Sequence, residues 1–260
     1  MRTSRRTLLG AALGGAAVAA VGLPATPATA ASWQLKWSPS ARSDGLRAFE
    51  TIEDDRADSH PAGAPHIRPD GDNWRFTMHK ADRDTSTDRQ RHEVTGLRTS
   101  SGFLKWLPGQ TWRITYSMYI PSSLKATTTF THIMQMKQPG AGSSPIVVQS
   151  LRRVNGAQTI ELQLPISGTL IGRTSLDPLH DTWTDVDFQI KVGDGSSGSV
   201  RWILKSGGST LIDKSRSGVD TFLADRVRPK WGIYRSLGDA SGSLQDCHLL
   251  LTNLRGYQLL

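Results

Sequence analysis

The segment "RQRHEV", residues 89–94, combines strand-like alternation with an unusual density of charge. In an extended strand Arg89, Arg91 and Glu93 lie on one face, while Gln90 and His92 lie on the other. A face buried in a core would be apolar, so the charged face contacts either water or an anionic partner. The ordinary alternative is a solvated face whose exposed ion pair contributes little to stability.

The segment "THIMQMKQ" offers a second set of polar side chains. Alternation places Gln135 and Lys137 on one strand face, and His132 on the other with Met134 and Met136. A polar sheet edge would explain Gln135 and Lys137 without any function, and His132 reads as an ordinary strand histidine.

A third set lies in "PKWGIYRS", where Lys230, Gly232 and Tyr234 share a face and Arg235 follows. Taken alone, Tyr234 is a core tyrosine whose hydroxyl reaches the rim. The strand "TYSMYIP" adds two further tyrosines, Tyr116 and Tyr119.

Together these residue types suit β-elimination next to a uronate. Charge-assisted hydrogen bonds from arginine, glutamine and lysine to the C6 carboxylate would stabilise the enolate-like intermediate. A base then removes the C5 proton, and an acid protonates the departing glycosidic oxygen. A tyrosine, with an ordinary pKa of about 10, needs cationic neighbours to act as the base. Arg91, Lys137 and Lys230 could supply them.

The elements that would position these residues read as short strands separated by turns. Trp112, Ile114, Tyr116, Met118 and Ile120 alternate with polar residues, and the segments 182–193 and 200–213, joined by the turn 194–199, form a Gly-rich hairpin region. No long amphipathic helix is evident, although 217–227 reads as a short helical turn and 54–74 as a long surface loop. The pattern predicts an all-β sandwich or barrel.

The first thirty residues predict a twin-arginine export signal. Arg5 and Arg6 precede a weakly apolar Ala- and Gly-rich run that ends in Ala28-Thr29-Ala30. We expect cleavage after Ala30, a secreted protein, and a single domain over residues 31–260. No membrane association is expected after cleavage.

Charge and cysteine content narrow the class of partner. The full chain carries +8, and loss of Arg2, Arg5 and Arg6 with the signal leaves +5. This suits an acidic partner, but nucleic acid is not expected because no nucleic-acid motif is present. Cys247 is the only cysteine and lies in an apolar run, so we predict a buried structural thiol.

Neither a metal site nor a cofactor is predicted. His60, His66, His79 and His180 fit no metal-ligand spacing along the chain. The segment "PDGDN" is too short to indicate calcium.

The chain resembles the jelly-roll polysaccharide lyases of the alginate lyase, glucuronan lyase and heparin lyase I-like type. The motifs that carry this resemblance are Arg91-His92-Glu93, Gln135-Met136-Lys137 and Lys230-Trp231-Gly232-Ile233-Tyr234, in that order. The resemblance implies a concanavalin A-like jelly roll of two antiparallel sheets with a concave substrate cleft.

The resemblance also implies roles for individual residues. Arg91 and Gln135 would hold the substrate carboxylate, Tyr234 would be the catalytic acid, and Glu93 would orient Arg91. Lys230 would line the cleft. We also predict substrate contacts from Glu93, Arg89, His132 and Arg235. Lys137 stands where alginate lyases have a histidine base, so the base could be Lys137, Tyr234 itself, His132 or His92. This departure favours a glucuronate-type glycan over alginate.

Two other classes share this fold. Laminarinase-like hydrolases carry an E-x-D-x-x-E strand, which is absent from this sequence. A non-catalytic lectin-like module for acidic glycans is the remaining alternative. We therefore predict a monomeric polysaccharide lyase that acts on an acidic polysaccharide.

Overall fold

The computed structural model describes residues 31–140 and 142–260. The predicted export signal, residues 1–30, lies outside the described residues. Within the described part, no helix is long and apolar enough to cross a membrane.

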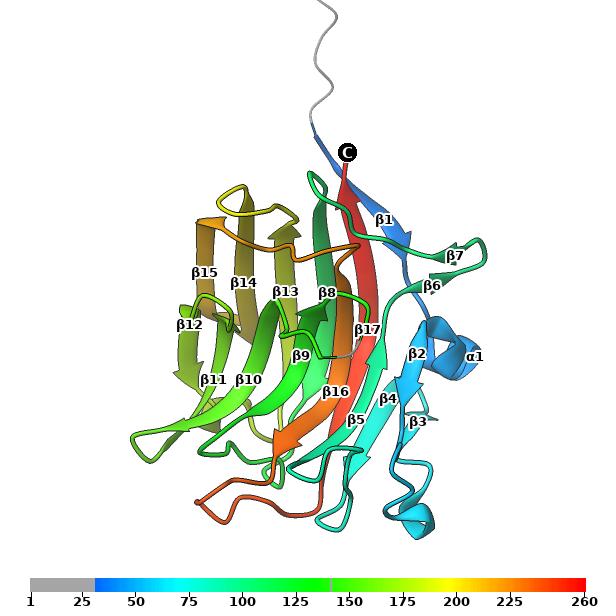
Figure 1. The fold of residues 1–260 in the computed structure, drawn as a ribbon, viewed down its shortest axis with the longest axis vertical. Helices are drawn as coiled ribbons and strands as arrows, with labels where there is room; N and C mark the ends of the chain where they lie inside the picture. Colours follow the sequence, from blue (N-terminus) through cyan, green and yellow to red (C-terminus); the bar gives the residue numbers. More distant parts are fainter. Residues whose placement is uncertain (1–30, 141) are drawn as a thin grey trace, which may run out of the picture. The chain divides into compact units, whose positions relative to one another are not determined.

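The domain is built from two large sheets whose strand pairs are all antiparallel (Figure 1). The first has the order β15-β14-β13-β8-β17-β4-β3, with β1 paired to β17. Its strands are β1 (Trp33–Trp37), β3 (Ile67–Asp70), β4 (Asn73–Met78), β8 (Thr111–Tyr119), β13 (Trp183–Lys191), β14 (Gly198–Ser206), β15 (Ser209–Val219) and β17 (Cys247–Leu259).

The second sheet has the order β12-β11-β10-β9-β16-β5-β2. Its strands are β2 (Thr51–Glu53), β5 (Arg89–Thr95), β9 (Thr131–Lys137), β10 (Val147–Val154), β11 (Ala157–Leu164), β12 (Thr169–Ser175) and β16 (Arg228–Ser236). A small hairpin, β6 (Arg98–Thr99) and β7 (Gly102–Phe103), and the short helices α1 (Ala41–Asp44), η1 (Gly45–Ala48), η2 (Pro61–Gly63) and η3 (Asp177–Leu179) complete the fold. The predicted all-β sandwich of the jelly-roll type is confirmed.

Burial along β8 shows why alternation predicts these strands. Every second side chain, from Trp112 to Met118, is buried, and the residues between them are partly exposed. The core lies between the sheets, where the Trp231 ring of β16 stacks on Trp37 of β1 at a centroid distance of 6.1 Å. The predicted structural thiol is confirmed, since Cys247 is buried and burial raises its pKa to about 11.

Two local predictions were wrong. The helical turn at 217–227 is absent: β15 continues to Val219, which pairs with Gly198 of β14. Pairing with a neighbouring strand thus overrides the local helical pattern. The surface loop at 54–74 contains η2 and β3, and its His66 is fully buried.

Candidate active site

Three adjacent strands, β5, β16 and β9, bring the sequence motifs together. Tyr234 of β16 lies opposite Arg91 of β5 and His132 of β9. Four residues back along β16, Lys230 lies opposite Gln135 of β9. The register therefore brings the three motifs side by side on one face of the seven-stranded sheet.

This face forms a cleft of about 660 Å³. Six of the predicted residues line it: Arg89, Arg91, Gln135, Lys137, Lys230 and Tyr234. Six basic and two acidic side chains line the cleft in all, so it presents an excess of positive charge. A cleft of this kind favours an anionic ligand.

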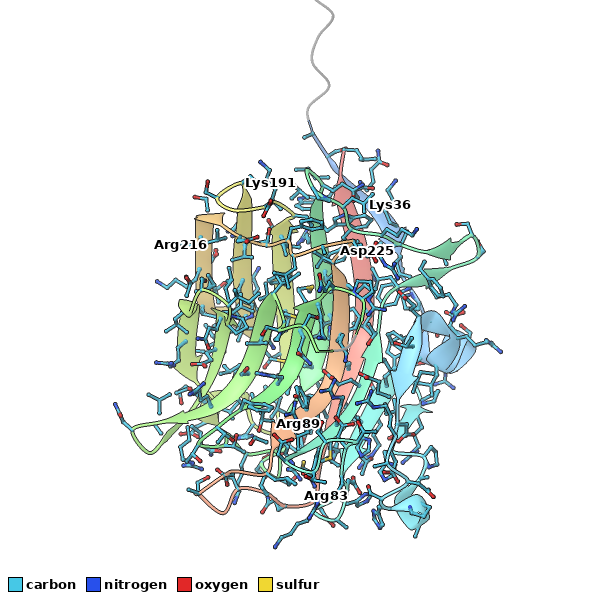
Figure 2. All side chains as sticks on the ribbon, in the orientation of Figure 1. Lys36, Arg83, Arg89, Lys191, Arg216 and Asp225 are labelled. Atoms are coloured by element: carbon cyan, nitrogen blue, oxygen red, sulfur yellow. The ribbon has the colours of Figure 1, made fainter. Side chains whose placement is uncertain are left out.

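Tyr234 sits between two guanidinium groups. Its hydroxyl oxygen accepts a hydrogen bond of 2.6 Å from Nη1 of Arg89. The guanidinium carbon of Arg91 lies 3.9 Å from the centre of the Tyr234 ring. Arg89 lies near one end of the seven-stranded sheet, at the same end of the domain as Arg83 (Figure 2). Tyr234 therefore has a cation at its hydroxyl and another over its ring face.

Arg91 is held by carboxylates on three sides. Its Nε lies 3.1 Å from Asp84, and its Nη1 lies 3.7 Å from Glu93 and 3.8 Å from Glu53. Burial opposes the charged form of Arg91, but Glu93 and Glu53 outweigh it and raise the Arg91 pKa. The Arg91 side chain lines the cleft and is 13% exposed, so a ligand carboxylate can reach its guanidinium group.

Glu93 lies beneath the residues that line the cleft and is fully buried. Its Oε1 accepts a hydrogen bond of 2.6 Å from Nε2 of Gln135, and its Oε2 lies 3.0 Å from Nζ of Lys230. A buried carboxylate with three basic or amide partners positions side chains rather than contacting a glycan. Glu93 therefore lies where it can orient Arg91, and its full burial is contrary to the direct substrate contact that was also predicted.

Lys137 lies on the cleft wall without an acidic partner within ion-pair distance among the described residues. Its Nζ donates hydrogen bonds to the carbonyl and hydroxyl oxygens of Ser143. Burial, assisted by Lys230 and Arg91, lowers the pKa of Lys137. The Lys137 ammonium group therefore loses its proton more readily than that of a free lysine.

Gly232 lets the strand that carries Tyr234 lie against β5. The backbone there has φ +141°, and a Cβ atom would lie 2.1 Å from the carbonyl oxygen of His92. Only glycine fits that space and conformation. The close approach of β16 to β5 thus explains why glycine occupies the middle of the Lys-x-Gly-x-Tyr motif.

His132 lies on the cleft side, contrary to strict alternation. The pairing of β9 with β10 skips one residue, so that His132 lies opposite Ser150 and Met134 opposite Gln149. This β-bulge reverses the side-chain parity. The His132 ring consequently stacks on Phe130 at 4.6 Å and lies 5.6 Å from the Tyr234 ring.

The environment of His132 keeps it neutral. Burial, with Arg91 and Arg152 nearby, lowers the pKa of His132 to about 3. Its Nδ1 lies 2.6 Å from the Ser150 hydroxyl oxygen, which leaves Nε2 for other partners.

Arg235 and His92 do not join the cleft. Arg235 is 1% exposed and points into the domain, where its Nε donates to Oε1 of Gln90 at 2.6 Å. Alternation along β16 turns it away from Tyr234, so its prediction as a substrate contact is corrected. His92 faces the same interior, with Nε2 3.0 Å from Asp82, so it cannot serve as the base in the cleft.

Four charged residues of the cleft were missed by sequence reasoning. They come from β2, from the irregular segments after β2 and before β5, and from the start of β16: Glu53, Arg56, Asp84 and Arg228. Arg56 bridges Glu53 at 2.8 Å and Asp84 at 2.6 Å. The dense charge of "ETIEDDRAD" was the available signal, but strand periodicity cannot place an irregular segment.

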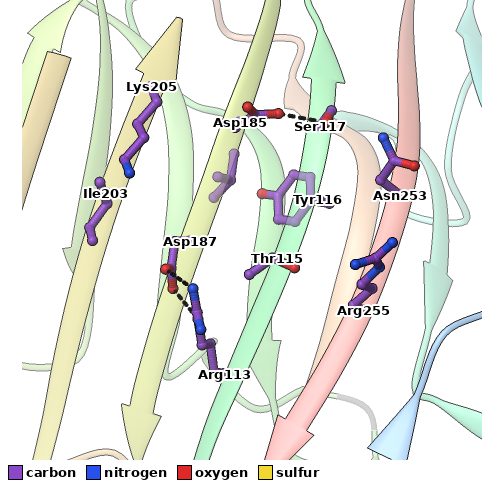
Figure 3. Close-up of a pocket in the computed structure, with 11 residues that line it drawn as sticks. Arg113, Thr115, Tyr116, Ser117, Asp185, Asp187, Ile203, Lys205, Asn253 and Arg255 are labelled. Carbon is purple, nitrogen blue, oxygen red and sulfur yellow. Dashed lines mark hydrogen bonds and ion pairs between the residues drawn. The ribbon is translucent and has the colours of Figure 1, made fainter. Parts of the chain in front are cut away.

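A second, smaller hollow of about 420 Å³ lies on the outer face of the eight-stranded sheet (Figure 3). Arg113 and Asp187 form two hydrogen bonds of 2.9 and 2.5 Å there, and Ser117 donates to Asp185 at 2.6 Å. Tyr116 is 3% exposed, and burial raises its pKa. Tyr119 packs against Trp183 at 5.6 Å. Neither tyrosine reaches the cleft.

Comparison with solved structures identifies the fold. An endo-β-1,4-glucuronan lyase from Trichoderma reesei superposes with a TM-score of 0.56 over 86% of this chain and 95% of its own, at 13% identity. A PL-14 alginate lyase from Aplysia kurodai gives a TM-score of 0.54 over 86% and 98%, also at 13% identity. The chain has the jelly-roll fold of polysaccharide lyases.

A third solved structure also matches the fold, whereas comparisons of the sequence find no match. The family 7 alginate lyase AlgAT5 gives a TM-score of 0.50 at 15% identity, over 76% of this chain and 84% of its own. No family model and no curated protein matches the sequence. The likeness to the polysaccharide lyase fold is therefore structural, and the chemistry must be argued from the cleft.

Proposed function

We propose that this protein is a secreted polysaccharide lyase that cleaves a glucuronate-type acidic polysaccharide by β-elimination. The observation that carries the proposal is the position of Tyr234, whose hydroxyl and ring contact Arg89 and Arg91 in a positively charged cleft. The predicted export signal and the fold shared with a glucuronan lyase support it.

Substrate binding begins at the carboxylate. The Arg91 guanidinium and the second amide hydrogen of Gln135 would donate to the C6 carboxylate, while Lys137 adds charge from the cleft wall. These donors stabilise the negative charge that develops when C5 loses its proton. Glu93 keeps Arg91, Gln135 and Lys230 in place from below.

Tyr234 is the best candidate for both proton transfers. As phenolate, stabilised by Arg89 and Arg91, it takes the C5 proton; the C–H electrons form the C4–C5 double bond, and the C4–O4 bond breaks. The phenol then returns that proton to O4 of the leaving chain. His132 is neutral at physiological pH, but a histidine whose pKa is about 3 is a weak base. His132 therefore serves as a packing neighbour of Tyr234.

The decisive experiment follows the ultraviolet absorbance of the unsaturated uronate end. The purified mature protein is incubated with glucuronan, alginate, a heparin-type glycan and a rhamnose-glucuronate glycan. We expect absorbance to rise with a glucuronate-containing glycan and the rise to disappear in Tyr234→Phe.

The controls separate the alternatives. If His132→Asn is as inactive as Tyr234→Phe, the base is His132 and not Tyr234. If no glycan yields product but one retards the protein in an affinity gel, the protein is a lectin-like module and the proposal fails.

A further inference from the structure

A cluster of histidines lies behind the cleft, on the opposite side of β5 from Arg91. His60, His66, His79 and Asp82 come from the segment after β2, the residue before β3 and the turn after β4. One nitrogen or oxygen atom from each of these four residues lies within 4.8 Å of the corresponding atoms of the others. His66 and Asp82 are fully buried, and the side chains of His60 and His79 are 30% and 25% exposed.

Asp82 lies at the centre of the cluster. Its Oδ1 lies 2.8 Å from Nδ1 of His60 and 3.5 Å from Nε2 of His66. Its Oδ2 accepts a hydrogen bond of 2.6 Å from the backbone N–H of His79 and lies 3.0 Å from Nε2 of His92. Oδ2 also lies 3.4 Å from Nδ1 of His79, so both carboxylate oxygens of Asp82 face histidines of the cluster.

The outer partners fix the orientation of His66. Its Nδ1 lies 2.9 Å from Oδ1 of Asp54, so the Asp54 carboxylate holds the outer nitrogen and Nε2 faces Asp82 in the cluster at 3.5 Å. A carboxylate behind the outer nitrogen is the usual support of a metal-bound imidazole.

Hydrogen bonding alone leaves this cluster unsatisfied. Among the described residues, Nε2 of His66 and Nδ1 of His79 are buried and have no hydrogen-bond partner. A buried nitrogen without a partner is costly. A cation between the rings would give both nitrogens a partner.

The backbone at Gly63 lies directly against the imidazole rings and leaves no space for a side chain. A Cβ atom on Gly63 would lie 2.7 Å from Nδ1 of His60 and 2.9 Å from Cε1 of His79. Any other residue in this turn would displace two of the imidazoles. Gly63 therefore allows η2 to fold directly onto the cluster.

We propose that His60, His66, His79 and Asp82 bind a divalent transition metal, with Zn²⁺ as the best match. Three imidazoles and one carboxylate suit zinc, whereas calcium and magnesium prefer oxygen ligands alone. The four ligands fill a tetrahedral shell, so the site is structural. Spacing along the chain did not indicate it because the ligands come from three separate segments.

The metal would brace the cleft from behind. The amide of Gln90, on β5, donates to the carbonyl oxygens of His79 and Asp82 at 2.9 and 2.7 Å. Asp84, two residues beyond the ligand Asp82, pairs with Arg91. Holding this turn therefore also holds one of the carboxylates that fix Arg91. The binding site itself does not depend on the proposed lyase activity.

The test uses untagged mature protein that has been stripped with a chelator and then titrated with Zn²⁺ alone. We expect one equivalent to bind and the melting temperature to rise by about 5–10 °C at a free zinc concentration about 100 times the Kd. Co²⁺ in its place should give the intense visible absorption of a tetrahedral site.

Matched variants identify the ligands. His79→Ala, at a partly exposed position, should weaken zinc binding by about 100-fold or more and abolish the cobalt spectrum, whereas His180→Ala, outside the cluster, should change neither. If the unmodified protein binds no zinc, or if His79→Ala binds it as tightly as the parent, the proposal is overturned and the cluster is a hydrogen-bonded network. The cobalt spectrum of the unmodified protein decides the question even if a variant fails to fold.

Discussion

The cleft on the seven-stranded sheet and the hollow on the eight-stranded sheet are both lined by polar residues at alternate strand positions. In the hollow, Arg113 pairs with one carboxylate, Asp187, and both side chains remain partly exposed. In the cleft, Arg91 is 13% exposed and lies within 4 Å of three carboxylates. The cleft also keeps an excess of cations around Tyr234. Alternation alone therefore does not distinguish a solvated sheet face from a binding face.

What separates the two regions is the layer beneath the polar side chains. Beneath the hollow, β8 turns apolar residues into the core. Beneath the cleft, β5 carries Gln90 and His92, which continue as a buried polar network to Asp82. A strand that is polar on both faces is costly to bury and is best explained by functions on both sides.

The largest expected difference between the two regions is catalytic. Tyr234→Phe should lower kcat by about 10²–10⁴-fold, because it removes the group proposed to transfer both protons. Tyr119→Phe, on the eight-stranded sheet, should leave the rate within about twofold of the parent. Initial rates of unsaturated product formation on the preferred glycan provide the measurement. Equal rates for the two variants would remove Tyr234 from the mechanism.

The second contrast is in stability. Arg91→Met leaves buried carboxylates without their partner and should lower the free energy of unfolding by about 3–5 kcal/mol. Arg113→Met removes a partly exposed pair and should cost about 1 kcal/mol or less. Urea unfolding of the three proteins measures both values. Similar losses would mean that the Arg91 network is no more tightly coupled than a surface pair.

These contrasts also show which features the sequence could predict. The regular strands were predictable because Trp112 to Met118 alternate without interruption. Arg91, Glu93, Lys230 and Tyr234 were correctly placed on one face for the same reason, since β5 and β16 pair without a shift in register.

The remaining features depend on irregular backbone. The bulge that turns His132 toward Tyr234 arises from the pairing of β9 with β10, and the sequence of β9 alone does not indicate it. Glu53 and Asp84 reach Arg91 from the end of a short strand and from an irregular segment. The histidine cluster joins three segments, and only the folded chain makes them neighbours.

A third contrast concerns glycine. Gly232→Ala would place Cβ against the β5 backbone in a conformation that favours glycine, and should cost about 3 kcal/mol or more. Gly208→Ala, in the β14–β15 turn, meets no atom within 4 Å at φ +82° and should cost about 1 kcal/mol from backbone strain alone. Thermal or urea unfolding distinguishes them. A Gly232→Ala protein as stable as Gly208→Ala would show that β16 can move away from β5.

The smallest contrast is a pH dependence of stability that comes from His132, on the cleft side of the molecule. Burial first, then Arg91 and Arg152, lowers the pKa of folded His132 to about 3 from 6.5. Above the unfolded value His132 is neutral in both states and contributes no pH dependence. As the pH falls below the unfolded pKa of 6.5, His132 binds a proton in the unfolded chain but not in the folded protein, so the free energy of unfolding decreases. We expect this residue to account for about 2 kcal/mol of the loss between pH 6.5 and 4.5.

His132→Asn isolates that contribution, because asparagine is polar but does not titrate. The parent should lose about 2 kcal/mol more than the variant over this range, measured as the difference between two urea-unfolding series. Parallel curves would mean that folded His132 titrates near its ordinary pKa. In that case His132 would be the stronger base in the cleft, and the removal of the C5 proton would pass from Tyr234 to His132.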